Sequence, residues 1–191
     1  MPDRLGMDEA AARIAALTGP VLIGIDGLPC SGKSTLADMV AQQAGFECLS
    51  LDDFVLPEAE WPSHIRPAFP FEYMRYAAFL GAIGDLATQG ACVYQSFDWA
   101  TLEVETEPRH LRLDKPILVE GVSALNPAVE AYYELRVFVE SDRATVLEAA
   151  AARGMGGWAT EWKSLFLPSA DLYMATHPEH RADLLVAGRG R

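Results

Sequence analysis

The sequence predicts a three-layer α/β fold in which helices cover both faces of a five-stranded parallel sheet. The first observation is an aliphatic run at residues 21–25, followed directly by a glycine-rich loop and then by a helical pattern. The second is the recurrence of short apolar runs separated by helical segments, which is typical of βαβ units. Such units cross over right-handedly and give parallel strands. The other predicted strands span residues 47–51, 116–119, 135–139 and 183–186.

The glycine-rich loop has the spacing G-x-x-x-x-G-K-[ST] of a phosphate-binding loop. Its glycines let backbone N–H groups approach a phosphate, and the helix that begins near Gly32 points its positive end there. Lys33 can reach the outer phosphates, and Ser34 can ligate Mg²⁺. A chance match is the alternative, and the position between strand and helix argues against it. The predicted ATP-binding residues are Gly27, Leu28, Pro29, Cys30, Ser31, Gly32, Lys33, Ser34 and Thr35.

The composition predicts a single domain over residues 1–191. Half of the 191 residues are hydrophobic (50%), which is enough for one core. The net charge of −12 repels polyanions, so we expect a small phosphate ligand and no nucleic-acid partner. Whether the chain forms a homodimer is left open by the sequence.

The compartment is predicted from the cysteines and from the absence of targeting signals. Three cysteines without C-x-x-C spacing indicate reduced thiols rather than a disulfide framework or a cysteine zinc site. The sequence shows no signal-peptide pattern and no apolar run of about 20 residues. We therefore expect a cytoplasmic protein without membrane contact.

The helices are predicted from apolar positions at helical spacing and from their caps. Asp8 can cap a first helix, and the helix after the phosphate loop ends at Gly45. A helix within residues 71–88 ends at Gly90, and Asn126-Pro127 opens a short one. The remaining helices follow Ser141 and occupy part of the stretch from Trp158.

Asp52 and Asp53 follow the second strand, at the carboxyl end where open α/β sheets place their ligand chemistry. A carboxylate here can accept the proton of a substrate hydroxyl while a γ-phosphoryl group is transferred. The alternative is a solvated acidic turn or a helix cap. Glu120 ends the fully apolar strand 116–119, which should lie beside the phosphate loop. There it can hold Mg²⁺ together with Ser34, or serve as a cap or salt-bridged strand end.

Residues 55–70 are predicted to form a loop that lines a substrate pocket. They contain four prolines, so no regular element should persist. His64 and Arg66 in this loop can reach substrate or phosphate, and the alternative is that they are surface residues.

Residues 91–107 are predicted to form a hairpin flap. A short strand at 92–94 is followed by a turn and by alternating residues at 102–107, which indicate an exposed strand. The rings of Tyr94 and Trp99 can stack on a flat substrate, or they can serve the packing of the hairpin.

Residues 153–167 are predicted to form a short lid. Phosphoryl transfer needs positive charge over the leaving phosphates, and a mobile lid often brings it. Arg153 ends a helix here and can close over the phosphates, while Gly154, Gly156 and Gly157 give hinge freedom or an ordinary helix break.

The chain resembles the uridine kinase and phosphoribulokinase group of P-loop kinases over about residues 20–188. GLPCSGKST followed by LSLDDF is similar to that group's pattern, which implies that Asp52 is the catalytic base. VEGV resembles the group's Glu-Gly step and supports Glu120 as a metal ligand. The segment YQSFDW looks like a stretched form of its Tyr-Asp pair, which implies that Tyr94 and Asp98 contact substrate. The segment Arg66-Pro67-Ala68-Phe69-Pro70 preserves the group's pattern Pro-x-Ala-Phe-Asp only in part, and Pro70 stands where the acid is expected.

This resemblance implies a P-loop NTPase fold and an ATP- and Mg²⁺-dependent kinase that phosphorylates a hydroxyl group of a small metabolite. Uridine or cytidine is the first acceptor that it implies, and a pantothenate-like or sugar alcohol is the second. A nucleotide-binding module without catalysis is the alternative, because the arginine-rich run of uridine kinases holds only Arg153 here. In the kinase hypothesis Asp52, Lys33 and Arg153 are catalytic. Its substrate contacts are Asp53, His64, Arg66, Tyr94, Asp98 and Trp99.

Overall fold

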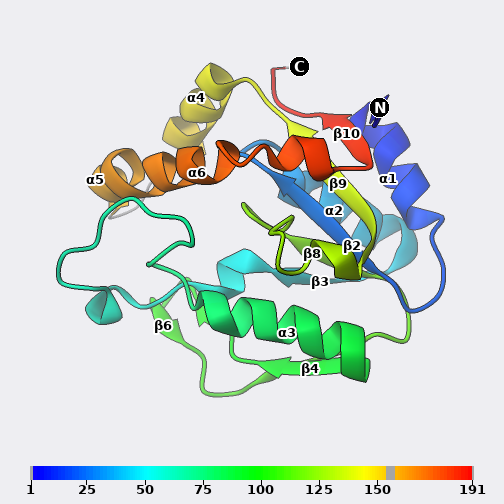
Figure 1. The fold of residues 1–191 in the computed structure, drawn as a ribbon, viewed down its shortest axis with the longest axis horizontal. Coiled ribbons are helices and arrows are strands. Elements are labelled where there is room, and N and C mark those ends of the chain that lie inside the picture. Colours follow the sequence, from blue (N-terminus) through cyan, green and yellow to red (C-terminus); the bar gives the residue numbers. More distant parts are fainter. Residues whose placement is uncertain (1, 154–157, 191) are drawn as a thin grey trace.

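A parallel six-stranded sheet forms the centre of the computed structural model, which describes residues 2–153 and 158–190 apart from the side chain of Arg153. The strand order is β1-β10-β9-β2-β8-β3, and each neighbouring pair is parallel (Figure 1). The five predicted strands are present, so the count of five is one short. The strands of this sheet are β1 (Asp3–Leu5), β2 (Leu22–Gly27), β3 (Glu47–Ser50), β8 (Ile117–Glu120), β9 (Tyr133–Glu140) and β10 (Leu184–Ala187).

The sixth strand, β1, escapes sequence analysis because it lacks the apolar pattern of a buried strand. It has three residues, two of them exposed and charged, and it pairs along one side with β10 at the sheet edge. Its position is fixed by the ladder and by an ion pair in which Arg4 Nη1 lies 2.7 Å from Glu140 Oε2. Neither contact leaves a signal in the local sequence.

The alternation of side chains along the strands builds a core on each face of the sheet. In β8, Leu118 packs on one face while Ile117 and Val119 pack on the other. The Leu118 face is covered by α1 (Met7–Ala15) and α2 (Lys33–Ala44). The opposite face is covered chiefly by α3 (Tyr76–Gln89), so the sheet is the middle of three layers (Figure 1).

Two predicted helix ends are confirmed, whereas Asp8 does not cap α1: it lies in the first turn, and Gly6 is the N-cap. Gly45 and Gly90 both take left-handed φ values, of 68° and 72°, and end α2 and α3 as expected. The helix predicted at Asn126-Pro127 is wrong: only a 3₁₀ turn forms, at Glu130–Tyr132. The remaining helices are α4 (Arg143–Arg153), α5 (Ala159–Glu161) and α6 (Leu167–Met174), with a π-helical stretch at Trp162–Phe166 between the last two. Further 3₁₀ turns span Leu51–Phe54, Glu58–Glu60 and Pro178–Arg181.

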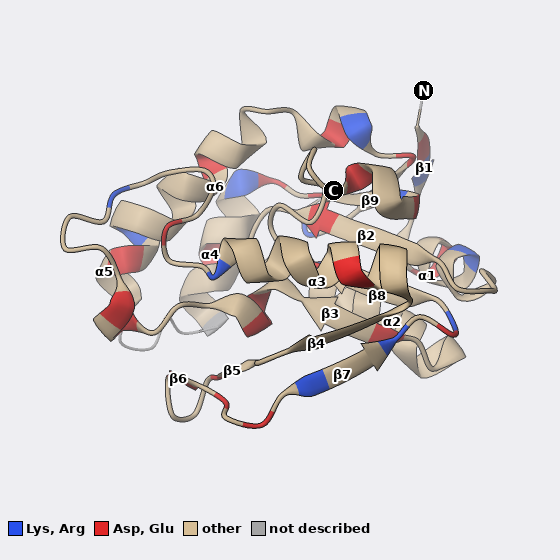
Figure 2. Cartoon of the chain, turned by 60° about the horizontal axis from the view of Figure 1, so that its bottom comes forward, with Lys and Arg blue, Asp and Glu red and all other residues tan. Residues whose placement is uncertain are grey.

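The predicted hairpin flap exists, but its pairing differs from the prediction. The strand β4 (Ala91–Tyr94) pairs with β7 (Arg109–Arg112), beyond the predicted boundary of 107. Between them β5 (Phe97–Asp98) pairs with β6 (Glu103–Val104), so the predicted strand at 102–107 shrinks to two residues. The alternating acidic residues continue into the loop between β6 and β7 (Figure 2).

None of the helices in the described part of the chain is long and apolar enough to cross a membrane.

We expect Gly24→Ala to destabilise the sheet, because a Cβ there would lie 2.8 Å from Leu125 Cδ2 and 2.9 Å from the Tyr133 ring. Overpacking of this kind costs about 1–3 kcal/mol of unfolding free energy. The matched control is Gly81→Ala in the interior of α3, where a Cβ meets nothing within 4 Å. It should stabilise the protein by about 0.5–1 kcal/mol through helix propensity. Urea unfolding measures both, and equal midpoints for Gly24→Ala and wild type would contradict the packing described.

Candidate functional site

The carboxyl ends of three adjacent strands meet at one edge of the sheet. Here β2 ends at Gly27, β3 at Ser50 and β8 at Glu120, and β8 lies between the other two. In register, Glu120 stands opposite Ile25 on one side and Ser50 on the other. The sheet therefore places one carboxylate between the phosphate loop and the segment that carries Asp52.

The phosphate loop is a tight turn that joins β2 to α2. Gly27 has a φ of 147°, and a Cβ there would lie 2.5 Å from the carbonyl oxygen of Val139. Gly32, with a φ of 112°, starts α2, and within the described chain no side chain caps that helix. Its first N–H groups are thus left facing the loop, as an anion site requires. The Lys33 ammonium, largely buried, donates to the Leu28 carbonyl at 2.9 Å and so folds over its own loop.

Asp26, the residue before the loop, has a fully buried carboxylate. It accepts hydrogen bonds from the backbone N–H groups of Gly27 at 2.6 Å, Ser123 at 3.0 Å and Leu125 at 2.8 Å, and from the Tyr173 hydroxyl at 2.5 Å. Burial raises the pKa of Asp26, and these hydrogen bonds oppose that rise. Sequence analysis missed both Asp26 and Tyr173, although an acid inside an apolar strand is a signal in itself.

The carboxylate of Glu120 is the group that other polar side chains of the site contact. Its Oε1 accepts a hydrogen bond from Ser50 at 2.9 Å and a longer one from Ser34 at 3.5 Å. Burial raises the pKa of Glu120; the charge of Lys33 opposes this and the charge of Asp52 adds to it. The structure therefore places Lys33, Ser34 and Asp52 near Glu120.

The donor set around Glu120 fits a magnesium ion. A serine hydroxyl and a carboxylate oxygen are hard oxygen ligands, which Mg²⁺ prefers. A divalent cation beside Glu120 would also offset the cost of burying its charge, which Lys33 only partly compensates. Ser34 and Glu120 are thus the residues that would hold the ion.

Asp53 does not point its charge into an open site. Its carboxylate accepts hydrogen bonds from Tyr94 at 3.0 Å, Ser96 at 2.9 Å and Arg109 at 2.9 Å, all from the hairpin. Arg75 donates to its backbone carbonyl at 2.7 Å. These contacts fasten the hairpin to the end of β3, so we assign Asp53 a structural role in place of the predicted substrate contact.

The three hairpin residues predicted to contact substrate are separated by the structure. Tyr94 is buried, stacks on Phe54 and donates to Asp53, so it belongs to the core. Asp98 accepts hydrogen bonds from the Ala100 N–H and the Thr101 hydroxyl and so closes the hairpin turn. Trp99 is half exposed and its ring lies 5.8 Å from that of Trp158, which leaves it free to meet a ligand.

The remaining predicted contacts lie at the periphery. His64 and Arg66 are exposed in the loop of residues 55–70, which is irregular as predicted apart from the 3₁₀ turn at Glu58–Glu60. Arg153 ends α4, but its side chain and the glycines at 154, 156 and 157 lie outside the described part of the chain. The predicted lid contact therefore stays a prediction.

An aromatic cluster, missed by sequence analysis except for Trp99, joins the loop, the hairpin and the segment after residue 157. The ring of Tyr73 lies 4.7 Å from Phe166, which lies 5.8 Å from Trp158 and 6.0 Å from Trp61. Trp158 in turn contacts Trp61 and Trp99. Asp52 lies near one end of the cluster, since its charge helps burial to raise the pKa of Tyr73. We call Trp61, Tyr73, Trp99, Trp158 and Phe166 the aromatic cluster.

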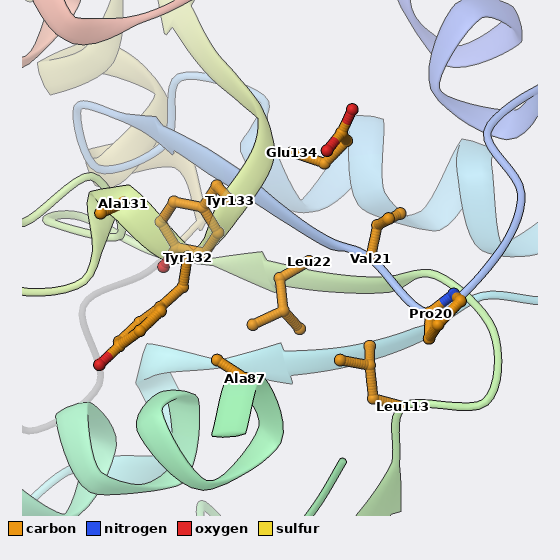
Figure 3. A pocket seen from close by; sticks show the side chains of 9 residues that line it. All are labelled: Pro20, Val21, Leu22, Ala87, Leu113, Ala131, Tyr132, Tyr133 and Glu134. Carbon is orange, nitrogen blue, oxygen red and sulfur yellow. The ribbon is translucent and has the colours of Figure 1, made fainter. Parts of the chain in front are cut away.

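A shallow cavity of about 340 Å³ lies at the other end of the sheet, beside the start of β2 and β9 (Figure 3). It is lined by apolar residues such as Leu22 and Leu113, by Tyr132 and by one acid, Glu134. Because parallel strands run away from it toward the phosphate loop, it is separate from the site described above.

Comparison with known proteins confirms the predicted fold. No family model and no curated protein matches the chain. A solved structure described as a possible uridine kinase from Bacillus stearothermophilus has a TM-score of 0.70 and 20% identity; the match covers 94% of this chain and 96% of that one. A proposed fructose transport system kinase from Silicibacter sp. TM1040 has a TM-score of 0.68 and 20% identity, covering 95% and 98%. The chain therefore has the P-loop NTPase fold of these proteins.

We expect Glu120→Gln to remove a pH dependence of stability. Burial raises the pKa of Glu120 above its usual value of 4.5, so the metal-free folded state binds this proton more tightly than the unfolded chain does. That contribution is complete below pH 4.5 and is lost as the pH rises through the raised pKa. Glutamine does not titrate and can still accept from Ser50.

The measurement is the urea unfolding free energy of metal-free protein between pH 4 and pH 8. The wild type should lose stability relative to Glu120→Gln as the pH rises, while Glu9→Gln, a change of an exposed acid on α1, should follow the wild type. Parallel curves for wild type and Glu120→Gln would contradict the burial of this charge.

Proposed function

We propose that the protein is an ATP- and Mg²⁺-dependent phosphotransferase that phosphorylates a hydroxyl group of a small metabolite. The observation that carries the proposal is the convergence of Lys33, Ser34 and Asp52 on Glu120 at the carboxyl edge of the sheet. A cation, a hydroxyl and two carboxylates beside a phosphate loop are the groups that phosphoryl transfer needs. The kinase names of the two proteins with the same fold agree with this chemistry.

In this proposal the loop binds and orients the triphosphate. The N–H groups at the start of α2 face the phosphates, and Lys33 exchanges the Leu28 carbonyl for a phosphate oxygen. Ser34 and Glu120 would hold Mg²⁺, and the ion would supply positive charge to the phosphates. Because Asp26 fixes Gly27 and the segment after Glu120, the two halves of this arrangement keep a constant spacing.

Asp52 is proposed to take the proton of the acceptor hydroxyl. Its backbone N–H donates to Ser50 Oγ at 3.2 Å, and the hydroxyl of Ser50 donates to Glu120. The base is thereby tied to the metal ligand through one residue. Its side chain is exposed, so an acceptor can approach it from solvent.

The acceptor is proposed to carry a flat ring that rests on the aromatic cluster. The cluster begins beside Asp52 at Tyr73 and extends to the half-exposed ring of Trp99. A pyrimidine nucleoside such as uridine or cytidine has both the ring and the hydroxyl. A sugar is the second candidate, because Pro70 stands where an acid for a ribose is expected and one protein of the same fold is named for fructose. A pantothenate-like alcohol is the third.

The test is acceptor-dependent release of ADP from ATP and Mg²⁺, measured with a panel of nucleosides, sugars and pantothenate. Release with one class of acceptor supports the kinase and identifies its substrate. Tight ATP binding without release for any acceptor would overturn the proposal in favour of a nucleotide-binding module. Failure to bind ATP would overturn both.

We expect Asp52→Asn to lower kcat at least about 100-fold, since a general base contributes about 10²–10⁴. Affinity for ATP should be unchanged, because Asp52 acts on the acceptor. Asp85→Asn on the exposed face of α3 is the matched control and should keep full turnover. Steady-state kinetics and ATP titration give both quantities, and an Asp52→Asn enzyme with wild-type kcat would remove the base assignment.

We expect Trp61→Ala to raise the KM for the acceptor about 2–12-fold, because a lost ring contact is worth about 0.5–1.5 kcal/mol. The KM for ATP should not change, and Trp61→Phe should restore most of the loss. The control is Tyr132→Ala, which removes an exposed ring at the far end of the sheet. Equal KM values for the acceptor in Trp61→Ala and Tyr132→Ala would show that the aromatic cluster does not bind the acceptor.

A further inference from the structure

Two histidines and a glutamate gather in the turn that precedes β10. His177 and His180 flank Glu179 in the sequence His-Pro-Glu-His, and the ligand atoms of the three side chains lie within 4.8 Å of one another. We propose that this turn binds one divalent transition-metal ion, with Zn²⁺ as the best match, at a site separate from the phosphate loop.

Both imidazoles approach the same carboxylate oxygen. His177 Nδ1 lies 3.0 Å and His180 Nε2 lies 3.6 Å from Glu179 Oε1, and the two rings stack with centroids 5.0 Å apart. Ligands about 2.0–2.1 Å from a tetrahedral metal ion are about 3.3 Å from each other. The two N···O distances bracket this value, so small rotations of the side chains would close them on a shared ion.

The chemistry of the three ligands selects the metal. Imidazole nitrogen suits Zn²⁺, Ni²⁺ and Cu²⁺, whereas Mg²⁺ takes oxygen ligands. Two histidines with one glutamate leave at least one coordination position to water or to another ligand. The set therefore differs from the oxygen donors of Ser34 and Glu120, and Mg²⁺ bound there would not compete for it.

The turn that carries the proposed ligands is held in place by the contacts of Arg181. Arg181, next in the chain, pairs with Glu130 at 2.9 Å and donates to the carbonyl oxygens of Leu125 and Thr176. His177 has a left-handed φ of 55°, which turns the chain so that its ring covers that of His180. The backbone is therefore already folded for binding, and only side chains would have to move.

The residues that form ion pairs with Glu179 would allow a cation to bind between the histidines. Among the described residues, the ion-pair partners of Glu179 are the two imidazoles, with no lysine or arginine. Both imidazoles are well exposed, with side-chain exposed fractions of 64% and 74%, so a metal ion can reach them from solvent. The competing explanation is a pair of plain histidine–glutamate contacts, which would bind no metal.

The experiment is titration of the full chain with Co²⁺ and with Zn²⁺ at pH 7.5, followed by calorimetry and, for Co²⁺, by its visible absorption. We expect one ion per chain and weaker binding as the pH falls, because protonated imidazole cannot ligate. At about 100-fold excess over Kd the bound ion should raise Tm by about 5–10 °C. Thiolate binding by the cysteines would show instead as a near-ultraviolet charge-transfer band of Co²⁺.

Variants assign the ligands. His177→Ala, His180→Ala and Glu179→Gln should each weaken binding at least about tenfold, since even the loss of a residue behind a ligand costs about 10–100-fold. His64→Ala and His110→Ala remove the other two histidines and should bind as the wild type does. Wild-type affinity in His177→Ala or His180→Ala, or no binding by the wild type at about 1 mM metal, would overturn the proposal.

Discussion

The buried carboxylate of Asp26 is the constraint on which the site depends. A charge without water is costly unless donors surround it, and this one has three backbone N–H groups and the Tyr173 hydroxyl. Those donors belong to the phosphate loop, to the segment after β8 and to α6, which are remote in sequence. A shift of any one of these donors would remove a hydrogen bond from a fully buried carboxylate. The carboxylate therefore ties the loop, the segment after Glu120 and α6 into one arrangement.

The parallel sheet supplies the second half of the geometry. Since β2, β8 and β3 are neighbours and run in one direction, the sheet itself brings their last residues together at one edge. Gly121 allows a close approach between the end of β8 and the segment after β3, because a Cβ there would lie 2.4 Å from the Cβ of Leu51. The missing side chain lets the segment of Asp52 approach the end of β8, and it explains why glycine follows the glutamate.

A structural feature can be predicted from the sequence when the interactions that determine it lie between residues close together in the chain. The phosphate loop, the helix stops at Gly45 and Gly90, and Glu120 at a strand end are set by nearby residues, and the structure confirms their placement. β1 and the pairing of β4 with β7 depend on partners far along the chain, and both were missed or misplaced. Asp52 and Asp53 are the same residue type and are neighbours in the sequence. Only the hydrogen bonds from the hairpin to Asp53 distinguish their roles. Tyr73 and the other rings of the aromatic cluster come from three segments that no local pattern connects.

The contact between Lys33 and the Leu28 carbonyl has a consequence for ligand recognition. The ammonium group of Lys33 already has a hydrogen-bond acceptor on its own loop. Under the proposed function, Lys33 would exchange this carbonyl oxygen for a phosphate oxygen. The gain from the lysine is then only the difference between a carbonyl and a phosphate oxygen, so weakly charged oxygen ligands would be poor competitors for this position.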